Sequence, residues 1–166
     1  MEDIKDSIQG FLIENLSFLP PEAIILIISA MPIIEIRGGL PSGVFLGLSF
    51  QSALFFSILG NLLPIAPILV FFKPVSKFLM RFNSYEKFYG WIYKRTMGKS
   101  HKVEKYGAMG LVLFTAIPFP TTGAYSACLA AILFFIPFRI AFFSISIGVL
   151  IASIIMGIIT YPLYLN

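Results

Sequence analysis

The chain has 166 residues, of which 58% are hydrophobic and 12% are charged, and its formal net charge is +4. A soluble domain carries about 25% charged residues, and a globule of this length could not hide so much apolar surface from water. The composition therefore excludes an ordinary soluble protein. It predicts an all-α integral membrane protein with a single membrane domain over residues 1–166.

The chain begins with two predicted segments of different character. Residues 1–19 place their apolar side chains on one helical stripe, which is typical of an amphipathic helix lying on the membrane surface. Residues 23–34 carry no charge, but a helix of this length reaches only about 18 Å, roughly half of a bilayer core with its rim. The stretch MPIIEIRGGLPSG (31–43) then interrupts the helix with prolines and glycines. Residues 44–49 are expected to return to the surface.

A full membrane span is predicted from Gln51 to Phe72, a run of 22 residues without charge. It completes a first unit over residues 20–72, which consists of a re-entrant helical hairpin followed by a transmembrane helix. Lys73 and Pro74 close the span.

The positive charge of the chain is concentrated after this span. Nine of the twelve Lys and Arg lie within residues 73–105, where only Glu86 and Glu104 oppose them. The positive-inside rule predicts that this segment is a cytoplasmic linker of amphipathic helices on the inner leaflet of the cell membrane. Its charge is therefore assigned to anionic lipid, and no nucleic acid is expected as a partner.

Residues 106–164 repeat the pattern of the first unit. An uncharged stretch (106–117) is interrupted by PFPTTGAYSACLA (118–130), and a return arm then leads to an apolar run that ends near Tyr161. Three pairs of residues correspond at an offset of about 85–88 positions: Pro32 with Pro118, Gly38 with Gly123, and Gly60 with Gly148.

One full span per unit gives the two units opposite orientations. The sequence therefore predicts an inverted-topology repeat, the usual architecture of secondary transporters, with the broken hairpins meeting at mid-membrane. Four to five ordinary spans kinked by proline remain an alternative. Small residues on the long helices would also permit the close packing of a homodimer.

Glu35 and Arg37 are the charges that this pattern leaves inside the membrane. A charge near the bilayer centre costs at least about 2.5–3.5 kcal/mol, and ionisable groups at this depth are usually functional. Glu35 and Arg37 are therefore candidates for a substrate or proton site. The alternative is a structural ion pair that holds the hairpin together.

The backbone around these charges suggests how an anion could be held. Gly38 and Gly39, next to Pro41, are predicted to form a turn whose free N–H groups make an anion nest at the start of the return helix. The planar guanidinium of Arg37 would add paired N–H donors, which suit phosphate. The second break is predicted to form a similar anion-binding turn, which contains Pro118, Pro120, Thr121, Thr122 and Gly123. Arg139 either extends to the cytoplasmic interface or turns inward as a second anion partner.

The motif pair PIIEIRGGLPSG and IPFPTTGAYSACLA resembles that of the small multi-drug export protein family, a short branch of the DedA/VTT membrane-protein superfamily. The resemblance covers about residues 20–157. It implies re-entrant hairpins, with an essential acid that corresponds to Glu35 and a second-half arginine that Arg139 matches plausibly. It also implies movement of polyprenyl phosphates or other lipids between leaflets, proton-dependent homeostasis and drug tolerance. Thr121 stands where the family commonly has glycine.

Three functions follow as hypotheses. The first is a proton-coupled transporter or flippase for a phosphate-bearing lipid of the polyprenyl-phosphate class, with the proton on Glu35. The second is proton-coupled export of small lipophilic cations, and the third is a non-transporting membrane scaffold. No enzyme, metal or cofactor signature is found, so an enzyme is not expected.

Overall fold

The structure is a computed structural model that describes residues 19–71, 100–117, 123–134 and 136–165. The described part of the chain contains helices and no strands, as the composition predicted. The predicted N-terminal helix (1–19) and nearly all of the predicted basic linker (73–105) lie outside these residues.

The first half contains two short helices followed by a long one. Helix α2 covers Pro21–Ser29, α3 covers Glu35–Phe45 and α4 covers Phe50–Leu62, and residues 65–71 continue the direction of α4 as a further helical stretch. Proline at the first position of α2 suits a helix start, because an N–H at that place would have no helical partner. The hydroxyl of Ser49 caps α4 by accepting from the Ser52 N–H at 3.3 Å.

The second half likewise contains two helices followed by a longer one, although its first helix is longer than its second. Helix α7 covers Ser100–Ala116, α8 covers Ala124–Leu133 and α9 covers Phe138–Leu165. Helix α7 thus begins inside the segment predicted to be linker, several residues before the predicted boundary at 105. Pro137 lies directly before α9. Because proline lacks the N–H that a continuing helix requires, it separates α9 from α8.

The two predicted full spans are confirmed as helices. The stretches Phe50–Phe71 and Phe138–Pro162 are long and apolar enough to cross a membrane. Helices α2 and α3 have nine and eleven residues and reach only about 14 and 17 Å, so neither could cross alone. In the first half, two short helices at a break therefore precede a span, as predicted.

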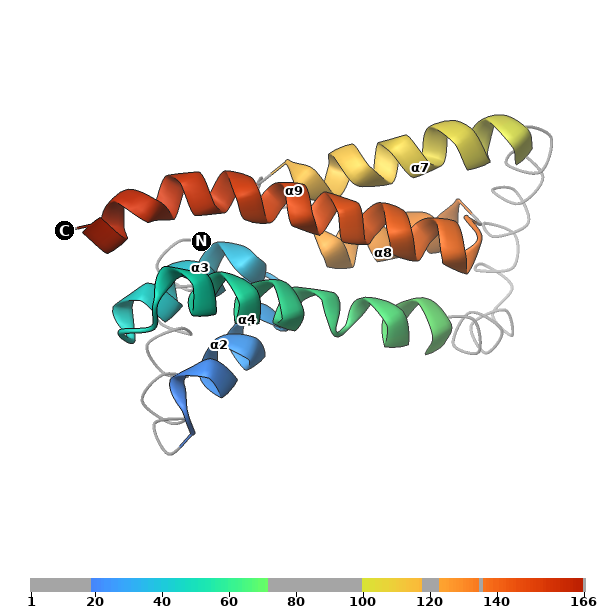
Figure 1. Ribbon diagram of the computed structural model, residues 1–166. Coiled ribbons are helices and arrows are strands. Elements are labelled where there is room, and N and C mark those ends of the chain that lie inside the picture. The colour runs from blue at the N-terminus through green and yellow to red at the C-terminus, as the bar shows by residue number, and fades with distance from the viewer. Residues whose placement is uncertain (1–18, 72–99, 118–122, 135, 166) are drawn as a thin grey trace.

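Figure 1 shows how the helices are arranged. Helix α7 packs along α9, α2 and α3 pack on α4, and α3, α4 and α8 all contact α9. Helices α7 and α9 run in the same direction in this view, and α4 runs in the opposite one. The two long helices therefore have the opposite directions that the inverted repeat requires. Re-entry into a membrane and the inverted symmetry itself remain predictions.

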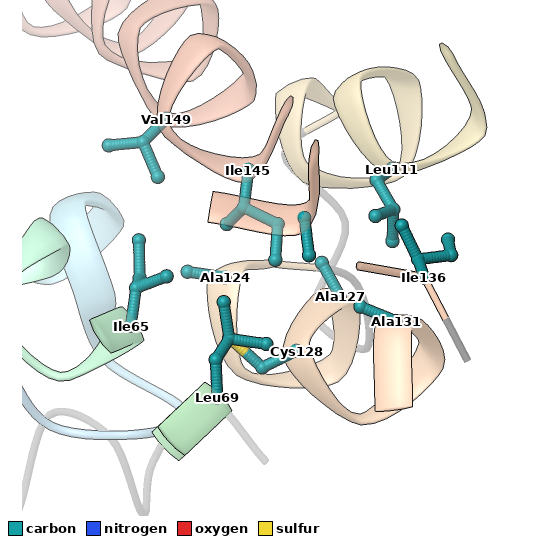
Figure 2. Close-up of a cluster of buried hydrophobic side chains, with 11 residues drawn as sticks. Ile65, Leu69, Leu111, Ala124, Ala127, Cys128, Ala131, Ile136, Ile145 and Val149 are labelled. Carbon is teal, nitrogen blue, oxygen red and sulfur yellow. The ribbon is translucent and has the colours of Figure 1, made fainter. Parts of the chain in front are cut away.

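The largest core cluster joins the two halves. Ile65 and Leu69, which follow α4, point toward Ala124 and Cys128 of α8, and side chains from α7 and α9 complete the cluster (Figure 2). The first half therefore buries part of its apolar surface against the second half.

One helix contact recurs in both halves and supports the internal repeat. A Cβ on Gly60 would meet the Leu26 carbonyl oxygen and lie 2.9 Å from the Ser29 Cβ. A Cβ on Gly148 would lie 2.8 Å from the Val112 carbonyl oxygen and 2.5 Å from the Thr115 Cβ. Val112 and Thr115 follow Leu26 and Ser29 by 86 positions each.

In both halves, then, a glycine of the long helix lets it approach the first short helix at the same pair of positions. Gly60 and Gly148, which were predicted to be equivalent positions, therefore make equivalent helix contacts.

The first break is shorter than predicted and lies earlier in the chain. It covers residues 30–34, where Pro32 removes a helical N–H and disfavours helical geometry at Met31. The stretch from Glu35 to Gly43, with its three glycines and Pro41, was predicted to be part of the break, but it is helical as part of α3. Residues 124–130 of the second predicted break are likewise helical, in α8.

Candidate functional site

Glu35 opens α3 in an unusual backbone conformation. Its φ is 51°, and Ile33 two residues earlier has φ 87°, so two side-chain-bearing residues of the break lie in the left-handed region. For a β-branched residue such as Ile33 this region is a genuine outlier, and such strain persists only where the surrounding structure enforces it. The break thereby carries Glu35 into the interior, where its side chain is 7% exposed.

The carboxylate of Glu35 packs against the second half of the chain. A Cβ on Gly123 would overlap both carboxylate oxygens of Glu35, so only glycine leaves room for them. Gly123 also has φ 155°, a conformation that side-chain-bearing residues rarely adopt. The acid of the first break thus lies directly on the glycine that precedes α8.

Two hydrogen bonds connect the breaks of the two halves. An Arg37 Nη2–H donates to the carbonyl oxygen of Ile117, just after α7, at 3.4 Å. The Tyr125 hydroxyl of α8 donates to the carbonyl oxygen of Ala30, just after α2. In each bond, a side chain of one half donates to a backbone carbonyl of the other half. The carbonyl can accept because it lies at the end of a helix, where it has no helical partner.

Polar side chains from two helices surround the carboxylate. Glu35 interacts electrostatically with Arg37 on its own helix and with Tyr125 and Cys128 on α8. Arg37 is half-buried, whereas Cys128 is fully buried. Among the residues that the structure describes, no three His, Cys, Asp or Glu side chains come together as metal ligands would.

The anion nest predicted at Gly38 and Gly39 is not formed. Both residues lie inside α3 without positive φ, and the Gly38 N–H already donates to the Ile34 carbonyl oxygen at 3.2 Å. Pro41 is tolerated inside the same helix. The prediction was wrong because the glycines were interpreted as turn residues. Gly39 instead allows α3 to pack closely on α2, since a Cβ at this position would overlap the Ser29 Oγ.

The other predicted site residues divide into two groups. Pro118, Pro120, Thr121 and Thr122 lie outside the described residues, so their predicted role remains untested. Arg139 is exposed on the first turn of α9. This position agrees with an arginine that extends to the membrane interface rather than one that turns inward.

The sequence reasoning missed Tyr125 and Cys128. Tyr125 and Cys128 are three positions apart in the chain, so on a helix they lie close to one another. That spacing was a usable signal, but the segment was interpreted as a break, in which helical spacing has no meaning. Ile117 carried no signal at all, since it contributes only its backbone carbonyl.

Comparison with known proteins identifies the family of this chain. Residues 35–155, more than half of the chain, match the family described as "Putative small multi-drug export protein". The chain belongs to this family. The match begins at Glu35, directly after the first break, and it includes the second break, the whole of the first span and most of the second. No curated protein and no solved structure matches the chain.

Membership in the small multi-drug export family, together with the two long apolar helices, identifies a membrane protein. The wider DedA/VTT resemblance, the particular membrane and the cytoplasmic placement of residues 73–105 remain predictions.

Proposed function

We propose that this protein is a secondary transporter that exports small lipophilic cations in exchange for protons carried by Glu35. The observation that carries the proposal is the position of the Glu35 carboxylate, buried between the two breaks and against Gly123. The family description supports export as the direction of transport.

The surroundings of Glu35 favour a cation over an anion as substrate. Arg37 donates to the Ile117 carbonyl, so part of its hydrogen-bonding capacity goes to the opposite break. The Gly38 amide is also engaged within its own helix. Glu35 is the acid at the junction of the two halves, and a carboxylate there attracts cations when ionised and binds a proton when they leave.

Transport would require the junction to open, because Glu35 is nearly inaccessible in this structure. The bonds from Arg37 to Ile117 and from Tyr125 to Ala30 hold the halves together and would break when they separate. Such rocking of one repeat against the other around a central site is how inverted-repeat transporters alternate access.

The test measures binding of tetraphenylphosphonium to the purified protein as a function of pH. Protons and the cation compete for Glu35, so affinity should rise with pH until the carboxyl is ionised, and binding should release protons. Glu35→Gln should weaken binding roughly 10- to 100-fold, the size of one charge-assisted interaction, and abolish its pH dependence.

Glu22→Gln is the matched control, since Glu22 lies in the first turn of α2 and away from the junction. The other titratable groups that face Glu35 are Arg37, Tyr125 and Cys128, so Tyr125→Phe and Cys128→Ala should keep the pH dependence. Equal binding by wild type and Glu35→Gln would overturn the proposal.

A carrier of phosphate-bearing lipids, of the polyprenyl-phosphate class, is the second candidate. Arg37 favours it, because its guanidinium is only half-buried at the junction and offers the planar fork that suits phosphate. The same assay distinguishes the two functions: polyprenyl phosphate should bind in this case, Arg37→Ala should abolish that binding, and tetraphenylphosphonium should not compete.

A further inference from the structure

Three polar side-chain atoms inside the first half have no hydrogen-bond partner. They are the Oγ atoms of Ser29 and Ser57 and the Oδ1 atom of Asn61, and the three residues are 0%, 0% and 2% exposed. Within the described part of the chain, nothing donates to these oxygens or accepts from them. A buried polar atom without a partner carries a free-energy penalty of about 1–3 kcal/mol, so a bound water or ion is the first explanation to consider.

The two hydroxyls meet at the junction of α2, α3 and α4, and the Asn61 amide lies one helical turn further along α4. A Cβ on Gly39 would overlap the Ser29 Oγ and lie 3.3 Å from the Ser57 Oγ, so both hydroxyls face the same point on α3. Asn61 follows Ser57 by one helical turn and lies on the same buried face of α4. Gly60 on that face approaches the Leu26 carbonyl oxygen of α2.

The second half shows that helix packing does not require this polarity. The residue that corresponds to Ser29 is Thr115, and its hydroxyl donates to the Leu111 carbonyl oxygen of its own helix at 2.7 Å. The positions that follow Ser57 and Asn61 by 88 residues are Ile145 and Val149, both fully buried. At these positions the second half has one hydroxyl, which is hydrogen-bonded within its own helix, and two apolar side chains, whereas the first half has three unpartnered oxygens.

We propose that Ser29, Ser57 and Asn61 bind a sodium ion. Hydroxyl and amide oxygens are the neutral hard ligands that an alkali cation prefers, and Asn61 Oδ1 can only accept, so it requires a donor or a cation. The Leu26 carbonyl oxygen at the same contact provides a fourth oxygen. Gly39 lies one turn after Glu35 on α3, so a cation here would also offset the buried negative charge of Glu35.

The experiment measures sodium binding by the purified full-length chain in detergent. Thermal unfolding is followed in sodium, potassium and choline chloride at equal ionic strength, and binding of radioactive sodium is measured alongside. Sodium should raise the Tm progressively with the logarithm of its concentration, by roughly 5–10 °C at one hundred times its Kd, because it binds only the folded state. Potassium and choline should not.

Two variants test the ligands separately. Ser57→Ala removes one hydroxyl, and Asn61→Val copies the residue at the corresponding position of the second half. Each should keep or raise the Tm in choline, which shows that it folds, and should weaken sodium binding at least about tenfold. Ser153→Ala is the control: its hydroxyl is equally buried but already donates to the Leu150 carbonyl oxygen at 2.7 Å, so sodium binding should be unchanged.

Two results would overturn the proposal. One is equal stabilisation of the wild type by sodium, potassium and choline, and the other is an unchanged sodium response in both variants. In either case these three oxygens do not bind sodium. Because the readout is sodium binding, the outcome is independent of whether Glu35 carries protons or binds substrate.

Discussion

Glu35 shows how a single residue can depend on a distant one. Its carboxylate is accommodated only because position 123 has no side chain, although the two residues are 88 positions apart in the chain. The left-handed conformations of Ile33 and Glu35 add strain to the same junction. Glu35 and the glycine that makes room for it thus form one unit.

Replacing Gly123 tests this unit. Gly123→Ala should lower the free energy of unfolding by roughly 1–3 kcal/mol, since the new methyl group overlaps Glu35 and the backbone conformation disfavours a side chain. Gly47→Ala is the matched control, because Gly47 has φ 80° but no atom within 4 Å of a Cβ, and it should lose only about 1 kcal/mol. Equal losses of unfolding free energy in the two variants would show that overlap with Glu35 does not destabilise Gly123→Ala.

The Tyr125 hydroxyl makes the second prediction at this scale. Tyr125→Phe removes the bond to the Ala30 carbonyl and should lower the free energy of unfolding by about 1 kcal/mol, the usual net value of one hydrogen bond. Tyr106→Phe, at an exposed tyrosine of α7, should change it by less than about 0.5 kcal/mol. Thermal unfolding of both variants beside the wild type provides the comparison, and equal effects would contradict the assigned role.

At the scale of the elements, the recurring glycine contact is the main feature. Gly60 lets α4 approach α2, and Gly148 lets α9 approach α7, each at a carbonyl oxygen and a small side chain. Close approach through small residues is how helices associate in membranes, where apolar area alone gives little driving force. The two halves therefore share this close approach of two helices, whereas the polarity inside the contact differs between them.

Alanine at these glycines tests the element contacts. Gly148→Ala should destabilise the protein by roughly 1–3 kcal/mol, since its methyl group would lie 2.5 Å from the Thr115 Cβ and force α7 and α9 apart. Gly60→Ala should behave alike if the units are equivalent. Gly110→Ala on α7, where a Cβ meets nothing within 4 Å, should not destabilise the protein and should stabilise it by up to about 1 kcal/mol, because alanine favours the helix more than glycine does. A neutral Gly148→Ala would refute the contact.

For the molecule as a whole, the question is how it sits in the membrane. The end of the first long helical stretch and the start of α7 flank the basic residues 73–99. The opposite directions of α4 and α9 are what two units of inverted orientation require (Figure 1). The positive-inside rule then assigns the basic segment to the cytoplasm.

Single cysteines in a Cys128→Ala background test this orientation. Ser84→Cys, in the basic segment, should react with a membrane-impermeant thiol reagent in inside-out vesicles and remain unlabelled in intact cells. Ser49→Cys, at the other end of α4, should show the reverse. Labelling of position 84 in intact cells would refute the assignment.

Much of the fold follows from local composition. The membrane class, the two long spans and the break at Pro32 each depend on a run of neighbouring residues, because hydropathy and the missing proline N–H act where they occur in the chain. Glu35 was recognisable as a candidate site residue for the same reason, since a charge inside an apolar run is conspicuous without any knowledge of its neighbours.

Tertiary packing decided the rest. RGGLPSG is helical, although its glycines and proline indicated a turn, because Gly39 and Gly43 serve contacts with Ser29 and Ala53. The meeting of Glu35 with Gly123, and of Arg37 with the Ile117 carbonyl, depends on distances between segments some eighty residues apart. Such distances are properties of packed helices, and no local pattern of residues encodes them.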